Sequence, residues 1–142
     1  MKIFMLVAAL LAAQPGAALG CSIPFDPRPA EVQQDERARW SYARSEAIAE
    51  AVAIQSSRRR EPGIVRVLRV IKGPYRPGRL LVLDTVDPSL CGAGSLRRGE
   101  RGLIRIDRLN GRLVFGGWLP SDYLQRLDRL GLRPLGSPAP RR

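Results

Sequence analysis

The chain has 142 residues, with 24 Lys and Arg against 13 Asp and Glu, and its formal net charge is +11 at pH 7. It contains no His and two Cys. These counts exclude a Ser-His-Asp triad, a Cys-His dyad, a His-ligated metal and a zinc site with four thiolates. The length suits one domain. We expect a protein that is not an enzyme and that holds no metal or cofactor of its own.

The first twenty residues have the order of a secretory signal peptide. Lys2 supplies a positive charge, residues 3–13 are an uninterrupted apolar run, and the small residues Ala18 and Gly20 precede Cys21. The run is much shorter than the ~20 residues of a membrane-spanning helix. We therefore expect residues 1–20 to be a signal peptide, and the mature protein to be secreted or periplasmic with no transmembrane span.

A cysteine directly after the expected cleavage point has two interpretations. Export delivers the chain to an oxidising compartment, and Cys21 with Cys91 is the only intramolecular pair that two cysteines allow. The alternative is a lipoprotein signal, in which Cys21 is acylated and anchors the chain, although residues 18–20 match that signal poorly. The sequence favours the disulfide, and a lipid anchor at Cys21 stays open.

The start of the mature chain is predicted to be extended and then helical. Three prolines in residues 22–30 exclude a helix there. Residues 31–45 are rich in Glu, Gln, Arg and Ala, and Trp40, Ala43 and Ala47 fall at the spacing of an amphipathic helix. Residues 47–56 fit either a continued helix or a strand, and periodicity does not decide between them.

Three β-strands are predicted after this ambiguous segment. Residues 64–71 alternate apolar and polar positions and are rich in β-branched side chains, and residues 80–85 are a second apolar run. A Gly- and Pro-rich turn separates these two runs. Residues 102–107 form the third strand, with Leu103 on one face and Ile104 and Ile106 on the other.

The end of the chain carries a hairpin signal and a short helix. Asn110-Gly111 predicts a tight turn into a strand over residues 112–118, with a bulge at Gly116-Gly117. Ser121 is the expected N-cap of a last helix with an apolar stripe; the stripe comprises Tyr123, Leu124, Leu127 and Leu130. Residues 134–142 contain Pro, Gly, Ser and Arg, and we expect a flexible basic tail.

Short strands joined by tight turns, with helices at both ends, predict a small β-barrel or sandwich. Over roughly residues 21–118 the chain resembles the netrin-like, TIMP-like OB-fold proteins that bacteria secrete. The motifs that carry this resemblance are AIAEAV (47–52), VLRVIKGP (67–74), SLCG (89–92) and LRRGERGL (96–103).

The resemblance implies a mainly β fold, an OB-fold-like β-barrel over residues 21–133 with a short N-terminal helix and a short C-terminal helix. It makes residues 47–56 a barrel strand. It also ties the N-terminal Cys to a Cys of the central loop, here Cys91.

The same resemblance implies a way of binding. Tissue inhibitors of metalloproteinases chelate the protease zinc with the α-amino group and carbonyl of their first Cys, and the next side chain enters the specificity pocket. The matching residues are Cys21 and Ser22. The chain departs from the animal inhibitors at Ile23, where they carry another Cys. The expected function is a secreted, non-catalytic binding module that acts like an inhibitor of a secreted zinc metalloprotease.

A basic patch offers an alternative partner. It comprises Arg58, Arg59, Arg60, Arg97, Arg98 and Arg101. Such a patch could hold a structural or adhesive protein on an anionic envelope surface. Nucleic acid is not the expected partner, because export removes the chain from it and because 22 Arg against 2 Lys is the bias that GC-rich coding produces. Among the aromatic residues, Phe115 and Trp118 are expected to pack in the core.

Overall fold

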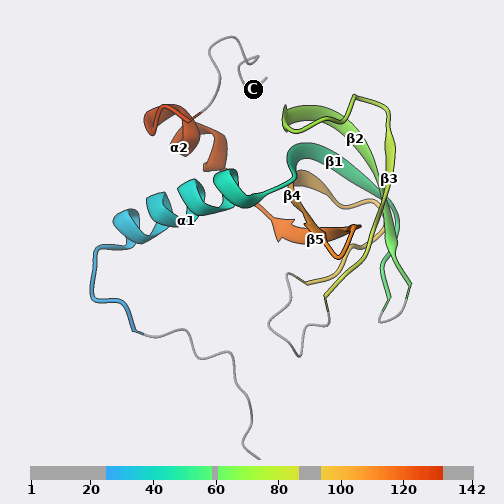
Figure 1. Ribbon diagram of the computed structural model, residues 1–142, viewed down its shortest axis with the longest axis horizontal. Helices are drawn as coiled ribbons and strands as arrows, with labels where there is room; N and C mark the ends of the chain where they lie inside the picture. The colour runs from blue at the N-terminus through green and yellow to red at the C-terminus, as the bar shows by residue number, and fades with distance from the viewer. Residues whose placement is uncertain (1–24, 59–60, 87–93, 133–142) are drawn as a thin grey trace, which may run out of the picture.

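The computed structural model describes residues 25–58, 61–86 and 94–132. Two helices and five strands follow in the order α1 (Ala30–Arg44), β1 (Ala47–Gln55), β2 (Gly63–Lys72), β3 (Leu80–Leu83), β4 (Arg101–Leu109), β5 (Arg112–Trp118) and α2 (Tyr123–Arg129) (Figure 1). Several sequence predictions lie outside the described residues: the signal peptide 1–20, Cys21, Ser22, Arg59, Arg60, Cys91 and the tail 134–142.

The strands form one antiparallel sheet in the order β3-β2-β1-β4-β5. β1 is the central strand, and its Ala49 lies opposite Val70 of β2 on one side and Ile104 of β4 on the other. The predictions of a mainly β fold and of a strand after the first helix are therefore confirmed. β1 is buried on both faces near its start, where Ala47 and Ile48 are both inaccessible to solvent. That double burial explains why its sequence lacks the clear alternation of an exposed strand.

The two edge strands approach each other at one point. Asp84, directly after β3, forms an isolated parallel bridge with Val114 of β5. The amide of Asp84 donates to the Leu113 carbonyl at 2.9 Å, and the amide of Phe115 donates to the Asp84 carbonyl at 2.8 Å. The sequence predicted a barrel, but no continuous ladder closes the sheet within the described residues, and the observed architecture is a five-stranded sheet with this single contact between its edges.

One face of the sheet holds the larger core, which we call the inner face. Ile104 and Ile106 of β4 are fully buried there, as the sequence predicted, together with Phe115 of β5. Trp118 meets the Phe115 ring edge-on, with 5.7 Å between the ring centroids. The expected core packing of Phe115 is confirmed, whereas Trp118 is only partly buried.

Both helices lie beside the sheet (Figure 1) and pack against a few residues of its opposite, outer face. Ile48 of β1 and Leu103 of β4 pack there with Ala38 of α1 and with Tyr123 and Leu127 of α2. The predicted last helix and the burial of its apolar stripe are confirmed.

α1 is also confirmed as a helix, but its predicted face is wrong. Trp40 is 53% exposed and Ala43 is exposed, whereas Ala38 and Ser41 are buried. The two buried side chains of the helix, Ala38 and Ser41, are small, and the larger Tyr42 is only partly buried against the same cluster. The helix can therefore approach its neighbours closely, and the bulky Trp40 is left at the surface.

The β4–β5 hairpin follows its sequence signal closely. Asn110 and Gly111 both have positive φ, 50° and 78°, as the two central residues of a type I′ hairpin turn require. Arg105 pairs with Gly117 and Ile106 with Phe115, which leaves Gly116 as the extra residue of the predicted bulge. A Cβ at Gly116 would lie 2.5 Å from an Asp107 carboxylate oxygen and 2.6 Å from the Arg105 Nε, so any larger residue there would have to displace this side-chain pair.

The predicted N-cap of the last helix is wrong. α2 begins at Tyr123 with Asp122 as its N-cap residue, and no side chain caps it. The Asp122 carboxylate instead lies 2.8 Å from the Arg126 guanidinium, one turn further along the helix. The N-cap position therefore lies one residue after the predicted Ser121, and the Asp122 side chain forms an ion pair within the helix instead of capping it.

Candidate functional site

The basic patch predicted from sequence is brought together in part. Arg58 follows β1, and Arg97 and Arg98 precede β4. Hydrogen bonds join these two segments: the amide of Ser57 donates to the Leu96 carbonyl at 3.0 Å, and the amide of Arg98 donates to the Ser56 hydroxyl at 2.8 Å. Arg58, Arg97 and Arg98 are exposed at this end of the sheet, and we call these three residues the basic end.

Arg101 does not add free charge to the basic end. Its guanidinium lies 2.8 Å from the Glu50 carboxylate on the neighbouring strand β1. Three other arginines near the hairpin are compensated in the same way, by pairs at 2.8–2.9 Å: Arg105 with Asp107, Arg108 with Glu46 and Arg112 with Asp84. The hydrogen bond from Arg108 holds the pKa of Glu46 below its usual value. Among the described residues, these four arginines are thus neutralised by local ion pairs and add little to the basic end.

A cleft that the sequence did not predict lies between α1, α2 and the end of β5. Its volume is about 610 Å³, and its aromatic lining consists of Trp40, Trp118 and Tyr123. The rest of the lining consists of the small or apolar residues Ala38, Gly116, Leu119 and Pro120 and of polar side chains: Gln34, Arg37, Ser41, Arg105, Asp122 and Arg126. The volume falls within the ~300–1,000 Å³ that is typical of small-ligand sites.

One side of the cleft is a buried hydroxyl pair. The Ser41 hydroxyl and the Tyr123 phenol lie 2.9 Å apart, although they are 82 residues apart in sequence. Burial raises the pKa of Tyr123 above its ordinary value of 10, so the phenol is protonated at neutral pH. This contact joins α1 to α2 and fixes that side of the cleft.

A second side is built around Arg126, whose side chain is only 9% exposed. Its guanidinium lies 2.6 Å from Asp35 and 2.8 Å from Asp122, and it donates to the Gln34 side-chain carbonyl at 2.6 Å. These hydrogen bonds hold the pKa of Arg126 above its ordinary value and that of Asp35 below. The result is a rigid array of donors and acceptors.

Trp40 forms the exposed rim of the cleft. The Arg105 guanidinium lies 5.1 Å from the centre of its ring, and the Arg44 guanidinium lies 5.8 Å from it. Both distances are within the range of cation–π attraction. The indole is therefore held in place by its neighbours while a large part of it faces solvent.

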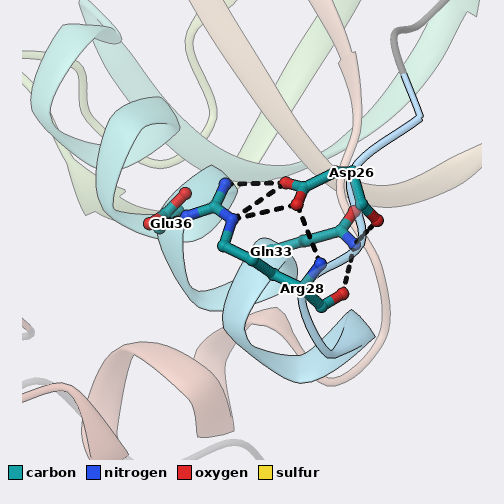
Figure 2. Close-up of polar contacts among 4 residues, drawn as sticks. All are labelled: Asp26, Arg28, Gln33 and Glu36. Carbon is teal, nitrogen blue, oxygen red and sulfur yellow. Dashed lines mark hydrogen bonds and ion pairs between the residues drawn. The ribbon is translucent and has the colours of Figure 1, made fainter.

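The chain before α1 is held on the helix by a small polar network (Figure 2). The Arg28 guanidinium pairs with Asp26 at 2.7 Å and with Glu36 of α1, and Gln33 donates to the carbonyls of Asp26 and Arg28. The hydrogen bond from Arg28 lowers the pKa of Asp26 to about 2. Phe25, Asp26 and Arg28 line a second, more open hollow that shares Arg37 and Trp40 with the cleft.

Residues 25–58, 61–86 and 94–132 contain no cluster of three His, Cys, Asp or Glu that could hold a metal ion. Within the same residues, no helix is both long and apolar enough to cross a membrane. The residues of the predicted zinc-binding N-terminus and of the disulfide, Cys21, Ser22 and Cys91, lie outside them, so their pairing and role stay predictions.

Comparisons with protein-family models, with curated proteins and with solved structures give no match to this chain. Its function is therefore inferred from the geometry of the sheet, the basic end and the cleft.

Proposed function

We propose that the chain is an exported, non-catalytic binding module built on an OB-type barrel. The observation that carries this proposal is the hydrogen-bonded contact between Asp84 and β5. With this contact, the strands follow the circuit β1-β2-β3-β5-β4 and return to β1, and β3 and β5 run parallel where they meet. The OB-fold is a five-stranded, partly open Greek-key barrel, and a circuit of five strands with one open junction agrees with it.

The proposed binding element is the mature N-terminus, with Cys21 as the ligand of a protease zinc and Ser22 as the side chain that enters the specificity pocket. We call Cys21 and Ser22 the wedge. A disulfide between Cys21 and Cys91 would hold the wedge against the segment between β3 and β4. The network of Asp26, Arg28 and α1 supports the idea, because it fixes the chain four residues after Ser22. A wedge that is already ordered loses less entropy on binding.

The experiment compares the mature protein with a variant that carries one extra Ala before Cys21, against a panel of secreted zinc metalloproteases. The native form should inhibit at least one protease. The extended form should not, because its α-amine is displaced from the metal. Equal melting temperatures of the two forms would show that the extension leaves the fold intact. Absence of inhibition by the native form, or equal inhibition by both forms, would end the proposal.

Ser22→Gly and Cys91→Ser separate the roles within the wedge. Ser22→Gly should change which protease is inhibited more than whether zinc is bound, because the side chain fills the pocket. Cys91→Ser should weaken inhibition and stability together. A Cys91→Ser variant with full inhibition and an unchanged melting temperature would show that no disulfide supports the wedge.

A second candidate function, attachment to an anionic envelope surface, is favoured by the basic end. Arg58, Arg97 and Arg98 are exposed on two hydrogen-bonded segments. Retention on envelope material should fall as salt rises, because exposed charges are screened beyond ~8 Å at physiological ionic strength. Replacing all three by Ala should reduce retention.

The matched control for this experiment replaces Arg66, Arg76 and Arg79 by Ala, since these residues are also exposed but lie on β2 and in the β2–β3 connection. Both variants remove the same charge. Equal retention of the two variants, or retention that does not depend on salt, would contradict a specific role for the basic end.

A further inference from the structure

The cleft between α1, α2 and the end of β5 is unused by the proposed function. It lies on the outer-face side of the sheet, where the helices pack, and none of its lining residues belongs to the basic end. What it could bind follows from its charges, its rings and its fixed hydrogen-bonding groups, taken in turn.

The charge of the cleft is nearly balanced. Arg105 is compensated by Asp107 at 2.9 Å, and Arg126 is compensated by Asp35 and Asp122. Arg37 is exposed and forms no close ion pair within the part of the chain that the structure describes, and its charge acts at longer range on Asp26, where it helps to lower the pKa of that carboxylate. The cleft therefore offers one positive charge that no close ion pair neutralises, which suits a ligand with a single anionic group.

The compensated pairs give one side of the cleft fixed donors and acceptors. The guanidinium of Arg126 can only donate hydrogen bonds, while the carboxylate of Asp122 can only accept them. Three of the five guanidinium N–H groups of Arg126 could be used by Asp35, Gln34 and Asp122, so an apolar ring pressed against this side would bury the remaining donors and acceptor sites without partners, which costs binding energy. A ligand with several hydroxyl groups can both donate and accept, and it would satisfy them.

The aromatic rim of the cleft requires that the ligand also has an apolar surface. Trp40 presents a large exposed ring surface, and Trp118 lines the same cleft. Aromatic rings provide apolar contact area at little conformational cost. The C–H face of a sugar ring is apolar while its rim is polar, so a sugar ring matches an aromatic surface that is bordered by hydrogen-bonding groups.

We propose that this cleft binds a saccharide unit that bears one carboxylate, with its ring against Trp40, its hydroxyls on the Arg126–Asp122 side and its carboxylate on Arg37. The cleft does not include the mature N-terminus. A failure to bind saccharide would therefore leave the protease proposal intact, and a failure to inhibit a protease would leave the saccharide proposal intact.

The two tryptophans of the chain both line the cleft, so intrinsic fluorescence reports directly on its occupancy. The full exported protein is titrated with trigalacturonate, with the neutral maltotriose and with 2-naphthoate, an aromatic carboxylate without hydroxyls. Trigalacturonate should change the emission saturably and bind about tenfold more tightly than maltotriose, the usual scale for one charged hydrogen bond. No saturable change with trigalacturonate, or tighter binding of 2-naphthoate, would overturn the proposal.

Two variants and two matched controls locate the site, and calorimetry measures their affinities independently of fluorescence. Arg37→Gln should remove the preference for trigalacturonate over maltotriose, whereas Arg39→Gln removes the same charge from an exposed position of α1 outside the cleft and should leave it unchanged. Trp40→Ala should weaken both saccharides about tenfold or more. Phe25→Ala, which removes an exposed ring outside the cleft, should not.

Because Arg37 and Trp40 are exposed, these variants should melt within a few degrees of the native protein. Equal affinity losses in Arg37→Gln and Arg39→Gln, or unchanged affinity in Trp40→Ala, would show that the saccharide binds elsewhere and would overturn the proposal.

Discussion

Arg126 of α2 and Asp35 of α1 form an ion pair in which the guanidinium nitrogen lies 2.6 Å from the carboxylate oxygen. The pair joins two helices that are far apart in sequence, and its Arg126 lines one side of the cleft together with Asp122. Since the Arg126 side chain is 9% exposed, removal of a partner leaves a largely buried charge with fewer hydrogen bonds. The packing of α2 on α1 should depend on this pair.

Asp35→Asn should therefore lower the melting temperature by several degrees and speed amide exchange in α2. Glu61→Gln is the matched control, because it removes the same charge from an exposed and loose pair with Arg58 at 3.9 Å. Thermal unfolding and hydrogen exchange measure both effects. If the two variants melt alike, the Arg126–Asp35 pair does not hold the helices together.

Asp35→Asn should also change how the free energy of unfolding depends on pH in acid. The hydrogen bond from Arg126 holds the pKa of Asp35 below its ordinary value of 3.8 in the folded state. The unfolded state then takes up this proton at a higher pH than the folded state does, so stability falls as the pH drops through this range. Urea unfolding between pH 6 and pH 3 should show a shallower decline for Asp35→Asn, and parallel curves for the two proteins would contradict this pKa effect.

Sequence reasoning predicted the strands well, because their signals are local. Asn110-Gly111 specifies its hairpin by turn conformation alone, and the alternation of Leu103, Ile104 and Ile106 separates the two faces of β4. The face of α1 was not predictable in this way. Trp40 looks like a core residue by spacing, but the packing of α1 places Ala38 and Ser41 inward.

The cleft could not be predicted from sequence, because its parts come from distant segments. The hydroxyl pair joins Ser41 to Tyr123 and the ion pair joins Asp35 to Arg126, and neither belongs to a motif. The basic patch was predicted from runs of Arg, but the pairing of Arg101 with Glu50 depends on the register between β1 and β4. Charge counts alone do not reveal which arginines are compensated.

Phe115→Ala should cost about 3–5 kcal/mol of unfolding free energy, because this ring is fully buried on the inner face and its removal leaves a cavity. Phe25→Ala deletes the same atoms from a side chain that is 91% exposed, and it should change stability by less than about 0.5 kcal/mol. Denaturant unfolding gives both values. Comparable losses in the two variants would contradict the assignment of Phe115 to the core.

Lys72 binds the end of α1. Its ammonium donates to the carbonyls of Tyr42 and Ser45, the latter at 2.8 Å, and it lies 5.1 Å from the centre of the Tyr42 ring. Lys72→Met should cost about 1 kcal/mol, because a cation at a helix C-terminus is lost. Lys72→Arg keeps the charge and should recover most of the stability. Equal losses in the two variants would show that the charge is not what matters.

The contact between the sheet edges can be tested at Asp84. Asp84→Pro removes the amide that donates to Leu113, and Asp84→Ala removes only the carboxylate that pairs with Arg112. Exchange of the Phe115 amide, which donates to the Asp84 carbonyl, should be protected in the native protein and in the Ala variant and faster in the Pro variant. A rapidly exchanging Phe115 amide in the native protein would contradict the OB-type circuit.

The proposed function requires a mature chain that begins at Cys21 and is held by Cys91. The most direct measurement is the intact mass of the natively exported protein before and after reduction. The expected mass is that of a chain starting at Cys21, and reduction should add the mass of two hydrogen atoms. A mass that retains residues 1–20, an acyl group on Cys21, or no gain on reduction would contradict a disulfide-held, free N-terminus.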